Sequence, residues 1–158
     1  MRVTFVPDGT LQIDNARIVY SDFAGTKFGR GGKSNFTIVI DDMDIVAALR
    51  EAGWDVKEKP PRDPDDIPFC TMKIVVKFND FGPFIYLRSG NAVNRLDENE
   101  IGRLDNIRFS NVDLDIRPYN WVVNGKSGRT AYLQGMEVTQ KISNRFADRY
   151  NNEDDLPL

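Results

Sequence analysis

The feature that most constrains the fold of this chain is a long pair of extended runs between Val112 and Gln140. A turn over residues 124–128 (N-G-K-S-G) separates the two runs, and its Asn and Gly residues are typical of tight turns. In the first run Val112, Leu114 and Ile116 recur at every second position, the period at which side chains of a strand share one face. The pattern predicts a β-hairpin with one buried face, as the last two strands of a β-domain.

The other face of the first strand carries Arg117, Tyr119 and Trp121, which the alternation directs outward. Aromatic rings interleaved with cations suit a surface for unpaired bases, because the rings stack on bases while the cations meet phosphates. Pro118 leaves a second interpretation open, since a bulge at this residue would exchange the two faces and place Trp121 in the core.

Further strands are predicted from short apolar runs bounded by turn residues. They cover residues 11–13, 17–20, 35–40, 71–78 and 84–88, and a turn at 79–83 predicts that the last two are hairpin mates. Residues 57–68 contain four prolines and are predicted to be a loop. Residues 89–105 are polar and predicted to be irregular, apart from a helical turn at 97–104.

One convincing helix is predicted to begin in the acidic segment 41–44, where aspartates can cap free N–H groups. Ile45, Val46 and Leu49 form its core-facing stripe, and Gly53 is a natural stop. The whole order predicts a mainly β fold with one helix. We expect an OB-like β-barrel with extended β-hairpins over residues 1–147 and a flexible acidic C-terminal tail over residues 148–158. An α+β sandwich is the alternative.

The amino-acid composition excludes several common kinds of catalytic and metal site. The 158 residues include no histidine and a single cysteine, Cys70, which removes Ser-His and Cys-His triads and an internal disulfide. Acidic pairs occur without a partner base or a metal-ligand spacing, so we expect no enzyme activity, no cofactor and no metal. No apolar run approaches the roughly 18 residues of a membrane span, and the N-terminal residues do not resemble a signal peptide.

The net charge of −3 is unevenly distributed. Cations outnumber carboxylates in residues 17–33 and again in residues 106–141, whereas acidic residues gather at 55–66 and in the tail. Such a chain can bind nucleic acid locally despite an acidic total.

The segment Gly25–Ser34 is a glycine-rich basic loop with Phe28 among its cations. It ends in Gly-Lys-Ser but is not a phosphate-binding loop of the nucleotide-hydrolase type, because Lys27 stands where glycine is needed and a strand follows. The loop is interpreted as part of a binding surface, and a merely solvated hairpin loop is the alternative.

The acidic C-terminus, N-N-E-D-D-L-P-L, is similar to the acidic tips with which bacterial single-stranded-DNA-binding proteins dock their partners. The tail is therefore a candidate for partner docking, and a plain solvated terminus is the alternative.

Three strings extend the resemblance to a family: N-A-R-I-V-Y-S-D-F-A-G, A-G-W-D-V-K and D-I-R-P-Y-N-W-V-V-N-G-K-S-G-R-T-A-Y-L-Q-G-M. Together they resemble small proteins of tailed bacteriophages that are described as single-stranded DNA-binding, with an OB-like fold. The resemblance covers most of residues 13–140. It implies an accessory of phage DNA replication or recombination that acts in the cytoplasm of the infected bacterium.

The predicted function is therefore to coat single-stranded DNA with little sequence preference. The chain is expected to act as a monomer or a homo-oligomer and not to associate with a membrane. Replication or recombination proteins are the expected partners of the tail. Two other functions stay open: a module that binds or inhibits a host protein through the hairpin and tail, and a structural β-protein of the virion. The predicted DNA contacts are aromatic and cationic side chains: Lys27, Phe28, Arg30, Lys33, Tyr86, Arg88, Arg117, Tyr119, Trp121, Lys126, Arg129 and Tyr132. The predicted partner-binding residues are those of the tail: Glu153, Asp154, Asp155, Leu156, Pro157 and Leu158.

Overall fold

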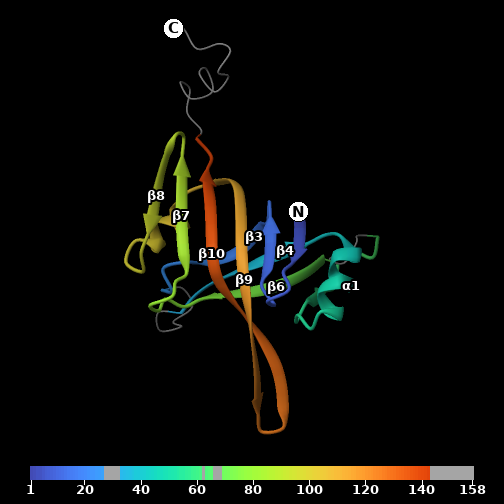
Figure 1. Cartoon of the computed structure of the whole chain (residues 1–158). Coiled ribbons are helices and arrows are strands. Elements are labelled where there is room, and N and C mark those ends of the chain that lie inside the picture. Colours follow the sequence, from blue (N-terminus) through green and yellow to red (C-terminus); the bar gives the residue numbers. More distant parts are fainter. Residues whose placement is uncertain (27–32, 62, 66–68, 143–158) are drawn as a thin grey trace.

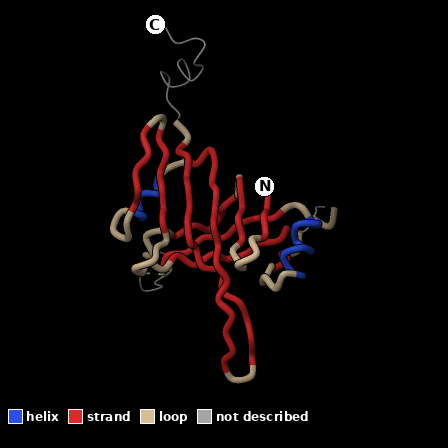
Figure 2. The backbone as a smooth tube through the Cα atoms, in the orientation of Figure 1, coloured by secondary structure: helices blue, strands red, loops and turns tan. Residues whose placement is uncertain are grey.

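The structure is a computed structural model that describes residues 1–26, 33–61, 63–65 and 69–142 (Figure 1). Strands dominate it, as Figure 2 shows, so the predicted mainly β fold with one main helix is confirmed. The helical elements are α1 (Met43–Glu51) and the short 3-10 helix η2 (Ile101–Asn106). The strands are β1 (Arg2–Phe5), β2 (Leu11–Asp14), β3 (Arg17–Asp22), β4 (Ser34–Ile40), β5 (Lys57–Lys59), β6 (Phe69–Val76), β7 (Phe84–Ser89), β8 (Ala92–Leu96), β9 (Phe109–Val123) and β10 (Lys126–Gln140).

The strands form one sheet in the order β1-β2-β9-β10-β6-β4-β3. Strand β5 pairs with β6, and β7 pairs with both β10 and β8. In Figure 1, β7 to β10 run along the long axis of the view while β3, β4 and β6 cross behind them. Among the described residues no pairing joins the ends β1 and β3, so the curved sheet encloses a core without closing into a complete barrel.

The core lies on the inner face of this sheet and follows the alternation seen in the sequence. On β9 the buried residues are Val112, Leu114 and Ile116, and β6 contributes Met72 and Ile74. One face of each strand is thus removed from water, which fixes the register, because a slip by one residue would expose the whole apolar set. The single cysteine, Cys70, is buried in the same core.

Helix α1 forms as predicted. The Asp42 carboxylate caps its first turn by accepting a hydrogen bond from the Asp44 N–H at 2.9 Å. Val46 and Leu49 are buried, and Gly53 adopts a φ of +94°, which allows the chain to turn after the helix. Within the described residues, neither helical element is long and apolar enough to span a bilayer.

Strands β9 and β10 form the predicted hairpin and project from the body of the molecule (Figure 1). The turn is tighter than predicted. Only Asn124 and Gly125 link the strands, with φ values of +51° and +76°, and β10 begins at Lys126. Two consecutive residues with positive φ suit the right-handed twist of the flanking strands, which explains how Asn-Gly alone reverses the chain.

The predicted pairing of residues 84–88 with residues 71–78 is wrong. Strand β7 instead lies parallel to β10, with Ile85 opposite Met136, and antiparallel to β8. A bridge between Asn79 and Gly82 turns the chain away from β6. One edge of β6 pairs with β4, and the other pairs with β5 and β10, so neither is left for β7.

Strands β1, β5 and β8 fall in segments for which no strand was predicted. Every residue of β5 is exposed, and so are four of the five residues of β8. With little or no buried face, these strands lack the alternation that would reveal them, and sheet pairing alone defines them.

Candidate nucleic-acid interface

The root of the hairpin carries a cluster of rings and a guanidinium on its outer face. Arg117 lies over the ring of Tyr132, with 5.0 Å between its guanidinium carbon and the ring centroid. The rings of Tyr119 and Tyr132 pack edge to face, with 6.0 Å between their centroids, and Tyr119 is 54% exposed. Pro118 does not exchange the two faces: Ile116 is buried and Arg117 and Tyr119 point outward, as the alternation predicts.

Trp121 lies farther along the same face and is half-buried rather than in the core. It pairs with Gly128 on β10, and its ring lies directly across that glycine. A Cβ atom added to Gly128 would lie 2.4 Å from Cζ2 of the indole. The ring therefore lies against the β10 backbone at Gly128, and the missing side chain is what makes room for it.

Arg129 occupies the opposite face of the hairpin, in register with Asn120. Its Nε donates to Asn120 Oδ1 at 2.7 Å and an Nη donates to the Ala52 carbonyl at 2.8 Å. Its guanidinium also lies 5.0 Å from the ring of Trp54. Arg129 thus anchors the hairpin on the segment after α1, a role that the sequence pattern did not indicate.

A groove of about 450 Å³ opens between this hairpin root and the strands β3, β5 and β6. Four cations line it against a single carboxylate, Asp55, which accepts a hydrogen bond from the Arg129 N–H at 3.2 Å. The cationic and aromatic residues of the groove are Lys57, Lys59, Lys73, Arg129, Tyr20 and Trp54. Sequence reasoning missed five of these as site residues: Tyr20, Trp54, Lys57, Lys59 and Lys73. The alternation of residues 71–78 already indicated that Lys73 points outward. No local pattern in the sequence indicates β5, which carries Lys57 and Lys59.

Tyr20 has an unusual backbone at the edge of this groove. Its φ is +51°, and the β3–β4 register shifts between Val19 and Asp22. A left-handed conformation is uncommon for a residue other than glycine, and an irregularity of this kind re-aims a side chain. The ring is 63% exposed and lies 4.7 Å from Nζ of Lys59.

The groove and the hairpin root form one continuous surface. Val75 is in register with Tyr132, so the outer face of β6, which also bears Lys73, adjoins the aromatic cluster. Lys77 is exposed directly after the end of β6. We define the basic–aromatic stripe as the outward side chains that run across β3, β5, β6, β10 and β9: Tyr20, Lys59, Lys57, Lys73, Lys77, Tyr132, Arg117 and Tyr119.

The other predicted DNA contacts lie around this stripe or outside the described residues. Lys33 is exposed and precedes Ser34, which pairs with Val76, so Lys33 lies at the Lys77 end of β6. Lys126 is exposed at the hairpin tip. Tyr86 and Arg88 lie on β7, in register with Glu137 and Thr139, and Arg88 forms an ion pair with Glu137 at 3.5 Å. Lys27, Phe28, Arg30 and the tail residues 153–158 lie outside the described residues.

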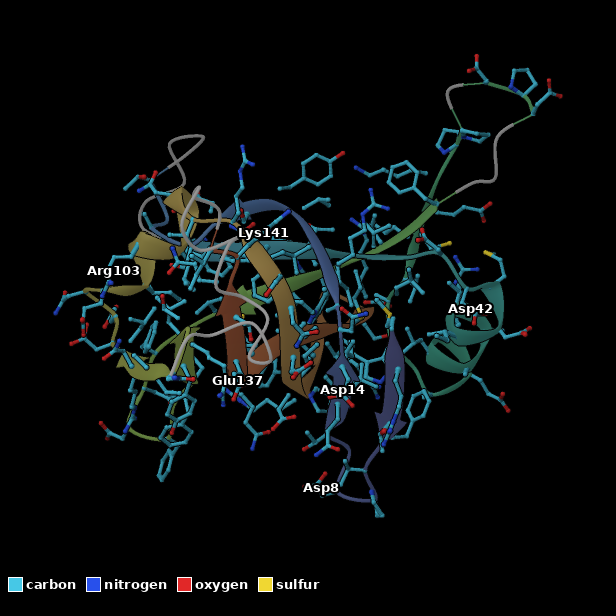
Figure 3. The ribbon with its side chains drawn as sticks, turned by 90° about the horizontal axis from the view of Figure 1, so that it is seen from above. Asp8, Asp14, Asp42, Arg103, Glu137 and Lys141 are labelled. Carbon is cyan, nitrogen blue, oxygen red and sulfur yellow. The ribbon has the colours of Figure 1, made fainter. Side chains whose placement is uncertain are left out.

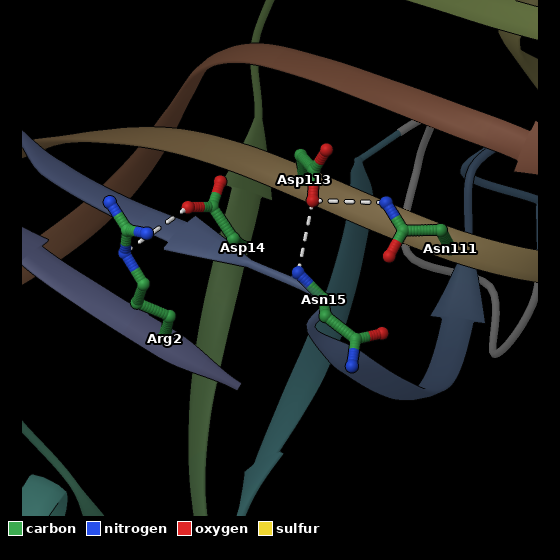
Figure 4. Close-up of polar contacts among 5 residues, drawn as sticks. All are labelled: Arg2, Asp14, Asn15, Asn111 and Asp113. Carbon is green, nitrogen blue, oxygen red and sulfur yellow. Dashed lines mark hydrogen bonds and ion pairs between the residues drawn. The ribbon is translucent and has the colours of Figure 1, made fainter.

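Carboxylates mark one border of the stripe, where β2, β9 and β10 adjoin. Asp113 accepts hydrogen bonds from the Asn15 N–H at 2.9 Å and from the Asn111 amide at 3.0 Å, and Arg2 lies 3.9 Å from Asp14 (Figure 4). In Figure 3, Glu137 and Asp14 lie near the centre of the view, and Asp42 of the α1 cap lies to their right. These carboxylates would repel a phosphate backbone, so they limit the cationic surface on this side.

Asp115 belongs to the same border and pairs with Gln12 of β2. Partial burial raises the pKa of its carboxyl group above the ordinary value, and the negative charge of Asp14 raises it further.

The fold and this surface together define a small β-domain with a cationic and aromatic outer face, the combination by which proteins hold unpaired nucleic-acid bases. The chain belongs to the family described as "Putative phage ssDNA-binding domain", whose sequence model matches residues 1–156.

Solved structures of the single-stranded DNA-binding protein from bacteriophage Enc34 are similar to this chain. The complex with ssDNA has a TM-score of 0.59 at 14% identity, covering 90% of this chain and 93% of that one. A second structure of the same protein has a TM-score of 0.59 at 13% identity, covering 90% of this chain and 87% of that one. A C-terminal truncation of that protein has a TM-score of 0.58 at 14% identity, covering 89% of this chain and 91% of that one. The likeness confirms the predicted OB-like fold. No curated protein sequence matches the chain.

Proposed function

We propose that this chain binds single-stranded DNA along the basic–aromatic stripe, with little sequence preference and without catalysing a reaction. The observation that carries the proposal is the series of cations and rings from Tyr20 to Tyr119, on a chain that belongs to a phage ssDNA-binding family. Aromatic rings stack on the flat faces of bases, and every base has such a face, so this contact carries little sequence preference. Recognition of a particular base by hydrogen bonds would need an ordered set of polar groups.

The charges of the stripe supply the electrostatic part of the binding. Lys57, Lys59, Lys73 and Lys77 are exposed on β5 and at β6, and Arg117 is held over Tyr132. Each phosphate that a cation neutralises on a single strand contributes about 0.7 to the slope of log affinity against log salt. Five occupied cations would therefore give a slope of about −3.5.

The stacking part would come from Tyr20, Tyr132 and Tyr119. Alanine substitution of a stacking ring costs about 1–3 kcal/mol per base. The edge-to-face contact between Tyr119 and Tyr132 restricts both rings before DNA arrives, so less side-chain freedom is lost on binding. Trp121, Tyr86, Phe28, Lys27, Arg30, Lys33, Arg88, Lys126 and Arg129 stay predicted contacts that would extend the surface.

In the cell, we propose that the chain coats single-stranded DNA during phage replication or recombination, in the cytoplasm of the infected bacterium. Residues 1–147 would form the binding domain, as a monomer or a homo-oligomer, and residues 148–158 would dock replication or recombination proteins through the acidic tip. Deleting residues 153–158 should keep or raise DNA affinity, since these residues carry three carboxylate side chains and no cation, and negative charge weakens the attraction of a protein for phosphates.

One observation favours a second function, the docking of a protein on the hairpin. Val122 and Val123 are 75% and 57% exposed at its projecting tip. A host-factor adaptor would lose its partner when both valines are replaced by threonine, whereas the affinity of the stripe for DNA would not change.

The proposal is tested by fluorescence anisotropy of a labelled oligo-dT of about 16 nucleotides, the upper end of the site size of one OB-fold. Titrations at low and moderate salt compare wild type with Tyr132→Ala and Tyr132→Phe. Tyr132→Ala should lower affinity about 5- to 150-fold, and Tyr132→Phe, which keeps the ring, should bind nearly as wild type. Phe5→Ala is a matched control, because Phe5 is a 46% exposed ring on β1, outside the stripe. Absence of wild-type binding at low salt would contradict the proposal.

A further inference from the structure

The turn between β6 and β7 presents a phenylalanine to solvent. Phe81 is 86% exposed, the highest exposure among the large apolar side chains that the structure describes. Single exposed apolar residues are common on protein surfaces. Phe81 is of interest because the turn fixes its position and because cations lie beside it.

Three hydrogen bonds hold the turn. The Asn79 N–H donates to the Gly82 carbonyl at 2.8 Å, and the Gly82 N–H donates to the Asn79 carbonyl at 3.2 Å. The side-chain oxygen of Asn79 accepts from the Phe81 N–H at 2.8 Å. Gly82 has a φ of +121°, and a Cβ there would lie 3.3 Å from the Phe84 nitrogen, so the turn requires glycine. The backbone beneath the ring is thus fixed before any ligand binds.

A hollow of about 280 Å³ lies beside this ring, close in size to the smallest common ligand pockets. Lys77 and Arg117 line it, and its lining includes no carboxylate among the described residues. Gln134 also lines it from β10, where the register with β9 shifts between Leu133 and Gly135. That irregularity makes Gln134 an extra residue in β10, and its exposed amide can donate to and accept from a base edge.

We infer that this hollow is a nucleotide subsite, in which one unpaired base stacks on Phe81 while Lys77 and Arg117 hold its flanking phosphates. Arg117 belongs both to the hollow and to the basic–aromatic stripe, so the subsite continues the DNA path beyond Tyr132 to the β6–β7 turn. The subsite rests on the proposed function, because it lengthens the surface proposed for single-stranded DNA. Its occupant is a nucleic-acid strand rather than a protein, because the polar side chains beside the ring are two cations, Lys77 and Arg117, and two amides, Asn79 and Gln134.

The test measures the affinity of an oligo-dT of about 16 nucleotides for Phe81→Ala, Phe81→Leu and the matched control Phe5→Ala. Phe81→Ala should weaken binding about 5- to 150-fold. Phe81→Leu should weaken it nearly as much, because leucine keeps apolar area but has no ring face. Phe5→Ala should bind as wild type. Unfolding midpoints for all three should match wild type, since neither ring is buried.

A second measurement follows the phosphate contact. Lys77→Ala should reduce the salt slope by about 0.7, whereas Arg103→Ala, which removes an exposed cation on η2, should leave it unchanged. The subsite is overturned if Phe81→Ala binds as tightly as wild type, or if Phe81→Leu restores full affinity. In either case the proposed function survives as long as the Tyr132→Ala loss is seen. Failure of the wild-type chain to bind would overturn both.

Discussion

Gly128→Ala tests whether Trp121 is a binding platform that depends on a missing side chain. The Cβ of alanine would lie 2.4, 2.8 and 3.0 Å from Cζ2, Cε2 and Cη2 of the Trp121 indole. Contacts this short cannot persist, so either the indole or the strand must move. Gly128 does not have a positive φ, so its backbone accepts alanine, and the ring is what we expect to leave.

The effect on stability should be small because two terms oppose each other. Alanine in place of glycine stabilises a strand by about 0.5–1 kcal/mol. Loss of the cross-strand contact between Trp121 and β10 costs about 0.2–1 kcal/mol. The net change stays within about 1 kcal/mol, a shift of roughly 2–4 °C for a domain of this size. The affinity for single-stranded DNA should instead fall about fivefold or more, the minimum for a lost stacking ring.

Intrinsic fluorescence and an oligo-dT titration measure the two consequences. Emission should shift to the red as Trp121 leaves β10, while buried Trp54 contributes a constant background. Gly135→Ala is the matched control, because a Cβ at Gly135 meets its neighbours at 3.6 Å or more. In a Trp121→Ala background, Gly128→Ala should have no further effect on DNA binding. Unchanged emission in the single variant, or a further loss in the double variant, would refute the reasoning.

Three other predictions concern single side chains. Lys73→Ala should lower DNA affinity and reduce the salt slope by about 0.7, with a stability change within about 0.5 kcal/mol; an unchanged slope would remove Lys73 from the DNA path. Arg129→Ala should cost about 1–2 kcal/mol in urea unfolding because it removes the hydrogen bonds that anchor the hairpin, whereas Lys126→Ala, an exposed cation on the same strand, should cost almost nothing. Asp115→Asn should stabilise the fold at pH 7, because the raised pKa of the Asp115 carboxyl group means that its ionisation is disfavoured in the folded state. The gain in stability should vanish below about pH 3.8, where this carboxyl group is protonated in both the folded and the unfolded chain. A gain that persists in acid would contradict that assignment.

Alternation in the sequence predicted the strands that have one buried face. Val112, Leu114 and Ile116 revealed β9, and Met72 with Ile74 revealed β6, because burial of one face requires a period of two. Helix α1 was equally readable, since its cap at Asp42 and its stop at Gly53 are local features. The outward face of the hairpin followed from the same period.

The remaining features depend on contacts between distant segments. The groove exists because β5 pairs with β6 and because Arg129 anchors the hairpin beside Trp54. Nothing in the Lys57–Lys59 sequence indicates that pairing. The parallel pairing of β7 with β10 is similarly hidden, because a turn between neighbouring strands in sequence favours a simple hairpin. The sequence could therefore indicate a cationic, aromatic surface without locating most of its members.

Strand β10 has a consequence for how the chain reaches its fold. It pairs with β9, β6 and β7 along its length, so it joins three parts of the sheet. During synthesis, β6 and β7 emerge from the ribosome well before β10. Strand β6 can pair with β4 and β5, and β7 can pair with β8, but the edge of each strand that pairs with β10 has no final partner until β10 arrives. Pairing between distant segments slows folding, and unpaired edges favour aggregation. We therefore expect folding to be completed only after residue 140 has been released, with the unpaired edges of β6 and β7 the parts most in need of chaperone protection.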